Sequence, residues 1–233
     1  MICFRKVSAI MDVKIRTLME RNFLLMMLCS VGYGILMKKI LGELSTYALS
    51  MAVLFNIAMA LYVTALFLAE EKEKNTLRVL MTSSVRGMEY FLGTLLPVLV
   101  EVEIINVLLA FLLGVKMNPE VWLIYILMTT LSALSCAMLG MIFGIYAKNQ
   151  MNTSMVITPA VIILMLIPMF SELLPLMEHI SKYLFTGIVM DVINEITYTS
   201  ISVGGMQWII LSVECAVTLG VFLVLYKRNG FEA

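Results

Sequence analysis

The sequence predicts an all-α integral membrane protein. We expect six transmembrane helices, an N-terminal amphipathic interfacial helix and a partly re-entrant outer helical hairpin between the fifth and sixth spans. Of the 233 residues, 61% are hydrophobic and only 14% are charged, whereas a soluble domain carries about 25% charged residues. Six long apolar stretches also follow one another along the chain, most of them near the roughly 20 residues that a helix needs to cross a bilayer.

Residues 1–21 carry apolar side chains at intervals of three and four, with charged residues between them. The apolar positions are Phe4, Val7, Met11, Ile15 and Leu18. This spacing is typical of an amphipathic helix, and its basic polar face suits a membrane surface. The same pattern also fits a helix packed against a partner protein, so both interpretations stay open.

The predicted spans are 22–41, 46–69, 90–114, 121–146, 154–170 and 207–226. The fifth is the shortest and contains Pro159 and Pro168, so we expect it to bend or break near its outer end. Residues 171–206 are too polar to cross and too apolar for an ordinary loop. They predict a short outer hairpin that dips partly into the membrane. The whole chain, 1–233, is expected to form a single transmembrane domain.

Lysine and arginine positions predict the orientation of the spans. With the N-terminus inside, twelve of the sixteen basic residues face the cytoplasm and four face the other side. The cytoplasmic set is Arg5, Lys6, Lys14, Arg16, Arg21, Lys72, Lys74, Arg78, Arg86, Lys148, Lys227 and Arg228, and the outer set is Lys38, Lys39, Lys116 and Lys182. Both termini are therefore expected in the cytoplasm, with the chain in the cell membrane. The formal net charge is zero, so no basic field favours nucleic acid as a partner.

The largest predicted cytoplasmic connection is 70–89, EEKEKNTLRVLMTSSVRGME. Leu77, Leu80 and Met81 have helical spacing, with Asn75 as the expected N-cap, and the acidic residues before it suit the positive end of a helix dipole. An apolar face on a cytoplasmic helix requires either a protein partner or the lipid surface.

This connection also resembles the permease subunits of ABC-2 type ABC exporters. Their pattern is Glu-(Lys/Arg)-Glu-x-(Gly/Asn/Lys)-Thr-Leu-x-x-Leu-x-x-(Ser/Thr), followed by a basic residue and the third span. The matching residues are Glu71, Glu73, Thr76, Leu77, Leu80 and Ser83. The predicted order of interfacial helix, spans and outer hairpin is similar to that family as well.

The resemblance implies that residues 71–83 form a coupling helix that docks on a separate ATP-binding subunit. It implies a complex of two ATPases and two permeases, the latter being two copies of this chain or one copy and a homologue. The chain has no G-x-x-x-x-G-K-[ST], so we expect no cofactor in it, and ATP and Mg²⁺ in the partner ATPase. The implied substrate is a hydrophobic or amphipathic peptide, antimicrobial or drug-like molecule.

Three glutamates fall inside predicted spans and are candidates for a translocation path: Glu101, Glu103 and Glu214. Glu101 lies about 16 Å into the third span, near mid-membrane. Glu103 is about 200° further round the same helix, so the two cannot face one pathway. Intramembrane carboxylates indicate function by default. The structural alternative is that they are protonated, or hydrogen-bonded to Ser, Thr or Asn of a neighbouring helix. We expect this alternative for two of the three and a path-lining role for at most one, with Glu101 preferred for its depth.

Small residues repeat every four positions in the fourth span, at Ser132, Cys136, Gly140 and Gly144. They therefore share one helical face, on which another helix can approach closely. We expect that face to pack within the monomer, with a dimer seam as the alternative.

Two other functions are weighed against transport by an ABC complex. A membrane protease is disfavoured, because the Glu70-Glu71 pair is followed by Asn75 rather than a basic residue and His179 is the only histidine. No catalytic residue or metal site is predicted. A proton-coupled secondary transporter that uses the intramembrane glutamates is the stronger alternative, although the halves show no internal repeat and only the fifth span is interrupted.

Overall fold

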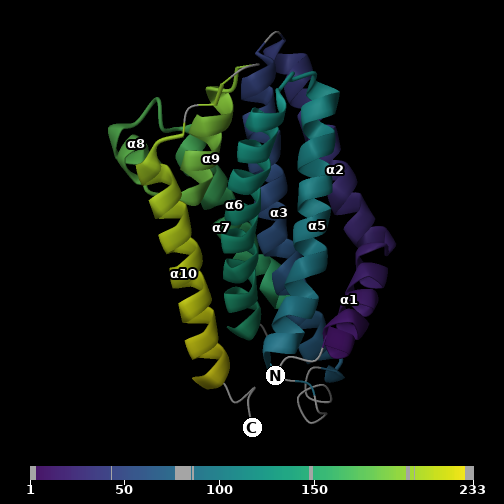
Figure 1. The fold of residues 1–233 in the computed structure, drawn as a ribbon. Coiled ribbons are helices and arrows are strands. Elements are labelled where there is room, and N and C mark those ends of the chain that lie inside the picture. The colour runs from purple at the N-terminus through teal and green to yellow at the C-terminus, as the bar shows by residue number, and fades with distance from the viewer. Residues whose placement is uncertain are drawn as a thin grey trace.

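The computed structural model describes residues 4–42, 44–76, 85, 87–146, 149–197, 200–201 and 203–228, with the side chains at 21–24, 27 and 227 outside the description. Its helices in chain order are α1 (Phe4–Leu18), α2 (Arg21–Leu41), α3 (Ser45–Glu73), α5 (Gly87–Leu113), α6 (Pro119–Tyr146), α7 (Gln150–Met169), α8 (Pro175–Ser181), α9 (Phe185–Asn194) and α10 (Gly205–Arg228). Over these residues the chain is all-helical, as predicted. Figure 1 shows an elongated bundle in which α1 begins and α10 ends at one end, while α8 and α9 lie at the other.

Five helices of the described part are long and apolar enough to cross a membrane: α3, α5, α6, α7 and the Gly205–Tyr226 part of α10. The helix α2, at the position of the first predicted span, has 21 residues, close to the roughly 20 that a crossing requires. Several of the α2 side chains lie outside the description, so the crossing of the membrane by this first predicted span stays a prediction.

Helix α3 is the centre of the bundle. It contacts α2, α5, α6, α7 and α9, and its side chains are buried along most of its length. A helix that is apolar on every side has to be surrounded by other helices or by lipid, and here it is surrounded by helices. A displacement of α3 would therefore alter its contacts with most of the other helices.

The α3–α6 contact depends on the small residues of α6. A Cβ atom on Gly140 would collide with the backbone oxygen of Leu61 and the hydroxyl of Thr64, and one on Gly144 would lie 2.8 Å from the Leu68 Cβ. Ser132 and Cys136 on the same face are also fully buried. The prediction that this face packs within the monomer is confirmed.

The N-terminal helix α1 packs against α5. Val7, Lys14 and Leu18 are among its buried residues, whereas Phe4 is 86% and Ile15 45% exposed. The predicted apolar face is therefore divided: part of it packs on the bundle, and part remains free for lipid or another chain. A buried lysine on the packed side was not predicted.

Residues 171–206 contain two short helices, α8 and α9; whether they form the predicted hairpin stays a prediction. Almost every residue of α9 is buried, and it contacts α3, α6 and α7. Gly187 makes the tight turn between them feasible, because its Cα faces the backbone and hydroxyl of Ser181 with no room for a Cβ. How far the pair enters a bilayer stays a prediction.

Helices α3 and α7 each extend four residues beyond the predicted spans at one end. Helix α3 continues to Glu73, four residues beyond the predicted 46–69, because charged residues near the end of a membrane helix can extend into water or pair with neighbours. Helix α7 is continuous over Gln150–Met169 despite Pro159. The helix ends at Met169, directly after Pro168 and near the predicted outer end. Whether it bends stays a prediction.

Candidate coupling site and intramembrane carboxylates

Four successive charged residues, Glu70 to Glu73, form the last turn of α3. Successive residues of a helix are rotated by about 100°, so these four side chains point in different directions around α3. Each of them contacts a different part of the chain. The last turn of α3 thereby becomes the point at which the ends of several helices meet.

Glu71 is the most enclosed of the four. Its Oε1 lies 2.6 Å from Lys14 Nζ of α1, and its Oε2 accepts a hydrogen bond from the Tyr90 hydroxyl of α5. The Lys14 ammonium also lies 4.5 Å from the centroid of the Phe67 ring, within the range of a cation–π contact. We call Lys14, Glu71 and Tyr90 the α3-end cluster. The Lys14 and Glu71 side chains are only 5% and 13% exposed, so each charge depends on the other for compensation.

Lys72 and Glu73 join α3 to the next two helices. The Lys72 ammonium donates to the backbone oxygen of Ile145, at the end of α6. Glu73 Oε2 accepts from the backbone N–H of Gln150, 3.1 Å away, at the start of α7. A cation at a helix C-terminus and an anion at an N-terminus both complement the helix dipole. These two contacts stabilise the α6–α7 connection against α3.

Lys74, the C-cap, and Asn75 directly follow the last residue of α3. Lys74 and Glu70 form an ion pair one turn apart, and this hydrogen bond and the nearby negative charge raise the pKa of Lys74. Asn75 has a φ of 56° and its N–H donates to Lys72 O. This left-handed backbone is typical of a residue that terminates a helix, whereas an N-cap is extended. The predicted helix that Asn75 would cap lies outside the described residues beyond Thr76, so its N-cap stays a prediction.

A groove of about 480 Å³ lies between α1 and the end of α3. Its lining is Val13, Lys14, Thr17, Glu20, Glu70, Glu71, Lys74 and Thr76. Both charge signs are present, so the groove can accept charged side chains or head groups of either sign at its rim.

Of the residues predicted to contact an ATPase, Glu71, Glu73 and Thr76 lie in the described part. Glu71 and Glu73 bind partners within the chain, and the Thr76 hydroxyl donates to the Glu71 backbone oxygen at 3.2 Å. Leu77, Leu80 and Ser83 lie outside the described residues. Their contact with an ATPase stays a prediction.

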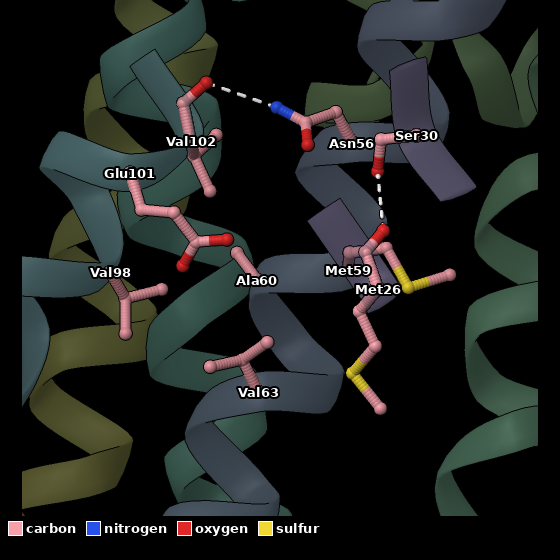
Figure 2. Close-up of a pocket in the computed structure, with 9 residues that line it drawn as sticks. All are labelled: Met26, Ser30, Asn56, Met59, Ala60, Val63, Val98, Glu101 and Val102. Carbon is pink, nitrogen blue, oxygen red and sulfur yellow. Dashed lines mark hydrogen bonds between the residues drawn. The ribbon is translucent and has the colours of Figure 1, made fainter. Parts of the chain in front are cut away.

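Glu101 faces a small cavity between α2, α3 and α5. Figure 2 shows its carboxyl group pointing into this space, with Asn56 and Ser30 on the opposite wall. The cavity has a volume of about 10 Å³, close to the minimum of roughly 10–15 Å³ for one water molecule. Within the described part of the chain, the buried Oε2 atom of Glu101 has no hydrogen-bond partner.

Glu103 faces α6 instead. Its Oε2 accepts from the Thr129 hydroxyl at 3.0 Å, and its Oε1 lies 3.5 Å from Asn106 Nδ2. Asn106 Oδ1 in turn accepts from Asn56 Nδ2 of α3 at 2.9 Å. Asn56 Nδ2 is also 3.0 Å from the Val102 backbone oxygen. A polar network therefore joins α3, α5 and α6 inside the apolar core.

Glu214 occupies a third environment, on α10. The backbone of Phe185, at the start of α9, contacts its carboxylate, and no described residue is hydrogen-bonded to its buried Oε2. The prediction that Glu101 and Glu103 face different sides of α5 is confirmed. Glu214, on α10, lies in neither of these two environments. Whether any of the three lines a translocation path stays a prediction.

The sequence reasoning missed Lys14, Tyr90 and Asn56. Lys14 had one available signal, since it follows Ile10 and precedes Leu18 by four residues on one helical face. Asn56 stood out as a single amide within the apolar second span, and such residues often hydrogen-bond across helices. Nothing in the sequence identified Tyr90, because its partner comes from a different helix.

The long apolar helices, the buried central helix and the intramembrane polar network together define a multi-pass membrane protein. A comparison with protein families places it more closely: the model of the ABC-2 family transporter proteins matches residues 22–224. The chain therefore belongs to the ABC-2 family and is a membrane component of an ABC transporter rather than a catalytic subunit. A search of curated proteins gave no match to the chain.

Proposed function

We propose that the chain is the permease of an ATP-driven exporter in the cytoplasmic membrane, with both termini in the cytoplasm. In this proposal two permeases, either two copies or one copy and a homologue, assemble with two separate ATPase subunits, which bind ATP and Mg²⁺. The exported molecule is hydrophobic or amphipathic. The observation that carries the proposal is the set of contacts made by Glu70 to Glu73, which tie the coupling segment (71–83) to the bundle.

The contacts explain how force on the coupling segment would reach the spans. The segment continues directly from the last turn of α3, and that turn is bound to α1, α5, α6 and α7. Because side chains that are held by buried ion pairs and hydrogen bonds move together with their helices, a push on the segment shifts several helix ends at once. Closure of the ATPases would supply that push.

The geometry also supports a division of labour within the coupling segment. Glu71 and Glu73 are occupied by contacts within the chain, so they hold the segment in place. We propose that the apolar side chains of Leu77 and Leu80, together with Ser83, make the contact with the ATPase. We propose that the charged groove between α1 and the end of α3 takes part in the same contact.

The orientation rests on the distribution of basic residues and the arrangement of the helices. The end of the bundle where α1 begins and α10 ends also carries the last turn of α3 (Figure 1). Most lysines and arginines are predicted to lie on this side, which is the side expected to face the cytoplasm. The coupling segment is then on the same side of the membrane as ATP.

A second candidate function, proton-coupled transport, is favoured by one observation. Glu101 has an unpartnered carboxyl oxygen beside a cavity of water-molecule size, an arrangement that could accept and release a proton. In that case, replacement of Glu101 by Gln would abolish transport without loss of folding. Unchanged transport by the Glu101→Gln variant would exclude this candidate.

The direct test of the proposed function is co-purification with candidate ATPases, followed by measurement of ATP hydrolysis and transport. We expect Leu77→Asp and Leu80→Asp to lose the ATPase, because a charge on the contact face would be buried without a partner. Leu176→Asp is the matched control, since Leu176 is 68% exposed on α8 at the opposite end of the bundle. If both coupling-segment variants retain the ATPase and transport normally, the proposal is wrong.

A further inference from the structure

A second, larger hollow lies on the outside of the bundle, between α5 and α6. It has a volume of about 550 Å³, within the roughly 300–1,000 Å³ of pockets that hold drug-sized molecules. We call it the α5–α6 groove; its lining is Leu96, Leu99, Val100, Glu103, Ile104, Val107, Ile126 and Thr130. Val100 and Ile104 are 56% and 63% exposed, and both helices are apolar enough to cross a membrane, so the groove opens towards lipid.

Glu103 is the only acidic residue in this lining. Thr129 donates to one of its oxygens and Asn106 lies within reach of the other. Both partners are neutral donors, so they orient the carboxylate and stabilise negative charge without cancelling it. Among the described residues no lysine or arginine forms an ion pair with Glu103.

An anionic group beside hydrocarbon is costly, and the cost is relieved either by a proton or by a cation that binds next to it. We propose that the α5–α6 groove binds a monovalent lipophilic cation that enters from the membrane, with the positive charge on Glu103 and the apolar body against the leucine, isoleucine and valine side chains. The charge complementarity between one carboxylate and an otherwise apolar groove distinguishes this occupant from a lipid tail. Beside a neutral lipid chain Glu103 would take up a proton, whereas a cation stabilises its charged form.

The site is connected to the centre of the bundle. Glu103 contacts Asn106, and Asn106 is hydrogen-bonded to Asn56 of α3. A cation that draws Glu103 towards the groove therefore weakens its contact with Asn106 and changes the environment of α3, whose other end carries the coupling segment. This step from binding to transport rests on the proposed function, whereas binding itself does not.

Binding is tested with the full-length chain alone in phosphatidylcholine nanodiscs, with no ATPase present. The probe is radiolabelled tetraphenylphosphonium, corrected for partition into empty nanodiscs. We expect saturable binding that is at least about tenfold weaker for Glu103→Gln, since loss of one partner of a desolvated charge pair is expensive. Gln retains an oxygen that can accept from Thr129, so the fold should survive.

Three controls separate the site from general apolar binding. Glu101→Gln changes the same residue type two positions away, on the opposite side of α5, and should bind the probe as the wild type does. Ile104→Trp, which fills the groove, should abolish binding, whereas Leu123→Trp, at an α6 residue that is 62% exposed outside the groove lining, should not. Tetraphenylborate, an anion of the same shape, should not compete.

The inference is overturned if Glu103→Gln binds as tightly as the wild type, if Glu101→Gln weakens binding equally, or if tetraphenylborate competes. These results are independent of the ATPase. If the probe binds as expected but no ATPase ever co-purifies, the proposed function fails and the cation site stands.

Discussion

The charged groups at the end of α3 and those inside the membrane spans differ in the partners that they have within the chain. At the end of α3 every charged side chain from Glu70 to Glu73 has a partner within the chain. Inside the spans, Glu101 and Glu214 each keep an oxygen without a partner among the described residues, and the donors to Glu103 found there are neutral. The first group holds helices together, whereas the second retains the capacity to bind something else.

This difference suggests how to distinguish charged side chains that stabilise the fold from those that could bind a ligand or a proton. A buried ion pair that joins two helices is satisfied, and its loss is felt as instability. An unpaired intramembrane carboxylate is costly to keep, and we propose that these glutamates serve binding or transport rather than stability. The two groups should therefore respond in opposite ways to neutralisation: stability falls in the first case, and binding or transport in the second.

The largest expected effect comes from Lys14. Lys14→Ala leaves Glu71 buried without its cation, so we expect the free energy of unfolding to fall by about 3 kcal/mol or more. Reversible unfolding in mixed micelles measures it. The double variant Lys14→Met with Glu71→Leu should recover much of the loss, because two apolar side chains need no compensation. A double variant as unstable as the sum of its single variants would contradict a direct pair.

The second-largest loss of stability is expected at the contact between α3 and α6. Gly140→Ala places a methyl group against the Leu61 carbonyl and the Thr64 hydroxyl, and overpacking of this kind costs about 1–3 kcal/mol. The same unfolding assay measures it. Gly220→Ala is the matched control, since nothing lies within 4 Å of a Cβ there, and it should cause no loss. Equal effects at both glycines would show that α3 and α6 are not so closely packed.

The intramembrane network should matter less for stability than the ion pair. Asn56→Leu removes the donor to Asn106 and to Val102, and hydrogen bonds between membrane helices are worth about 1 kcal/mol. Thr158→Val is the control, because the Thr158 hydroxyl bonds only to Ser154 of its own helix. An effect of Asn56→Leu as large as that of Lys14→Ala would erase the distinction between the two regions.

The smallest effect is expected at the exposed Glu178–Lys182 pair on the outer segment. Lys182 hydrogen-bonds to Glu178 and, with its charge, lowers the pKa of that carboxyl group. Lys182→Ala should raise the pKa of Glu178 towards its ordinary value, as followed by carboxyl-carbon NMR during an acid titration, with no measurable change in unfolding. A clear loss of stability would mean that exposed pairs also hold this fold.

The sequence was sufficient to predict the helical class, four of the long spans closely and the packing face of α6, since each depends on local composition or spacing. It was not sufficient for the α3-end cluster, because Lys14, Glu71 and Tyr90 come from three helices and meet only after packing. The end of α3 was misplaced for the same reason: Glu70 to Glu73 look like a loop until their partners are known. The two faces of α5 were predictable from helical geometry, whereas the groove beside Glu103 was not.

The most direct test of the account uses charge exchange in the α3-end cluster. The ATPase is co-purified with the wild type, with Lys14→Glu, with Glu71→Lys, and with the double variant that carries both changes. We predict that each single variant loses the ATPase, because the coupling segment is no longer held to α1, and that the double variant regains it. If the single variants bind the ATPase as well as the wild type, the cluster does not position the coupling segment and the central claim is contradicted.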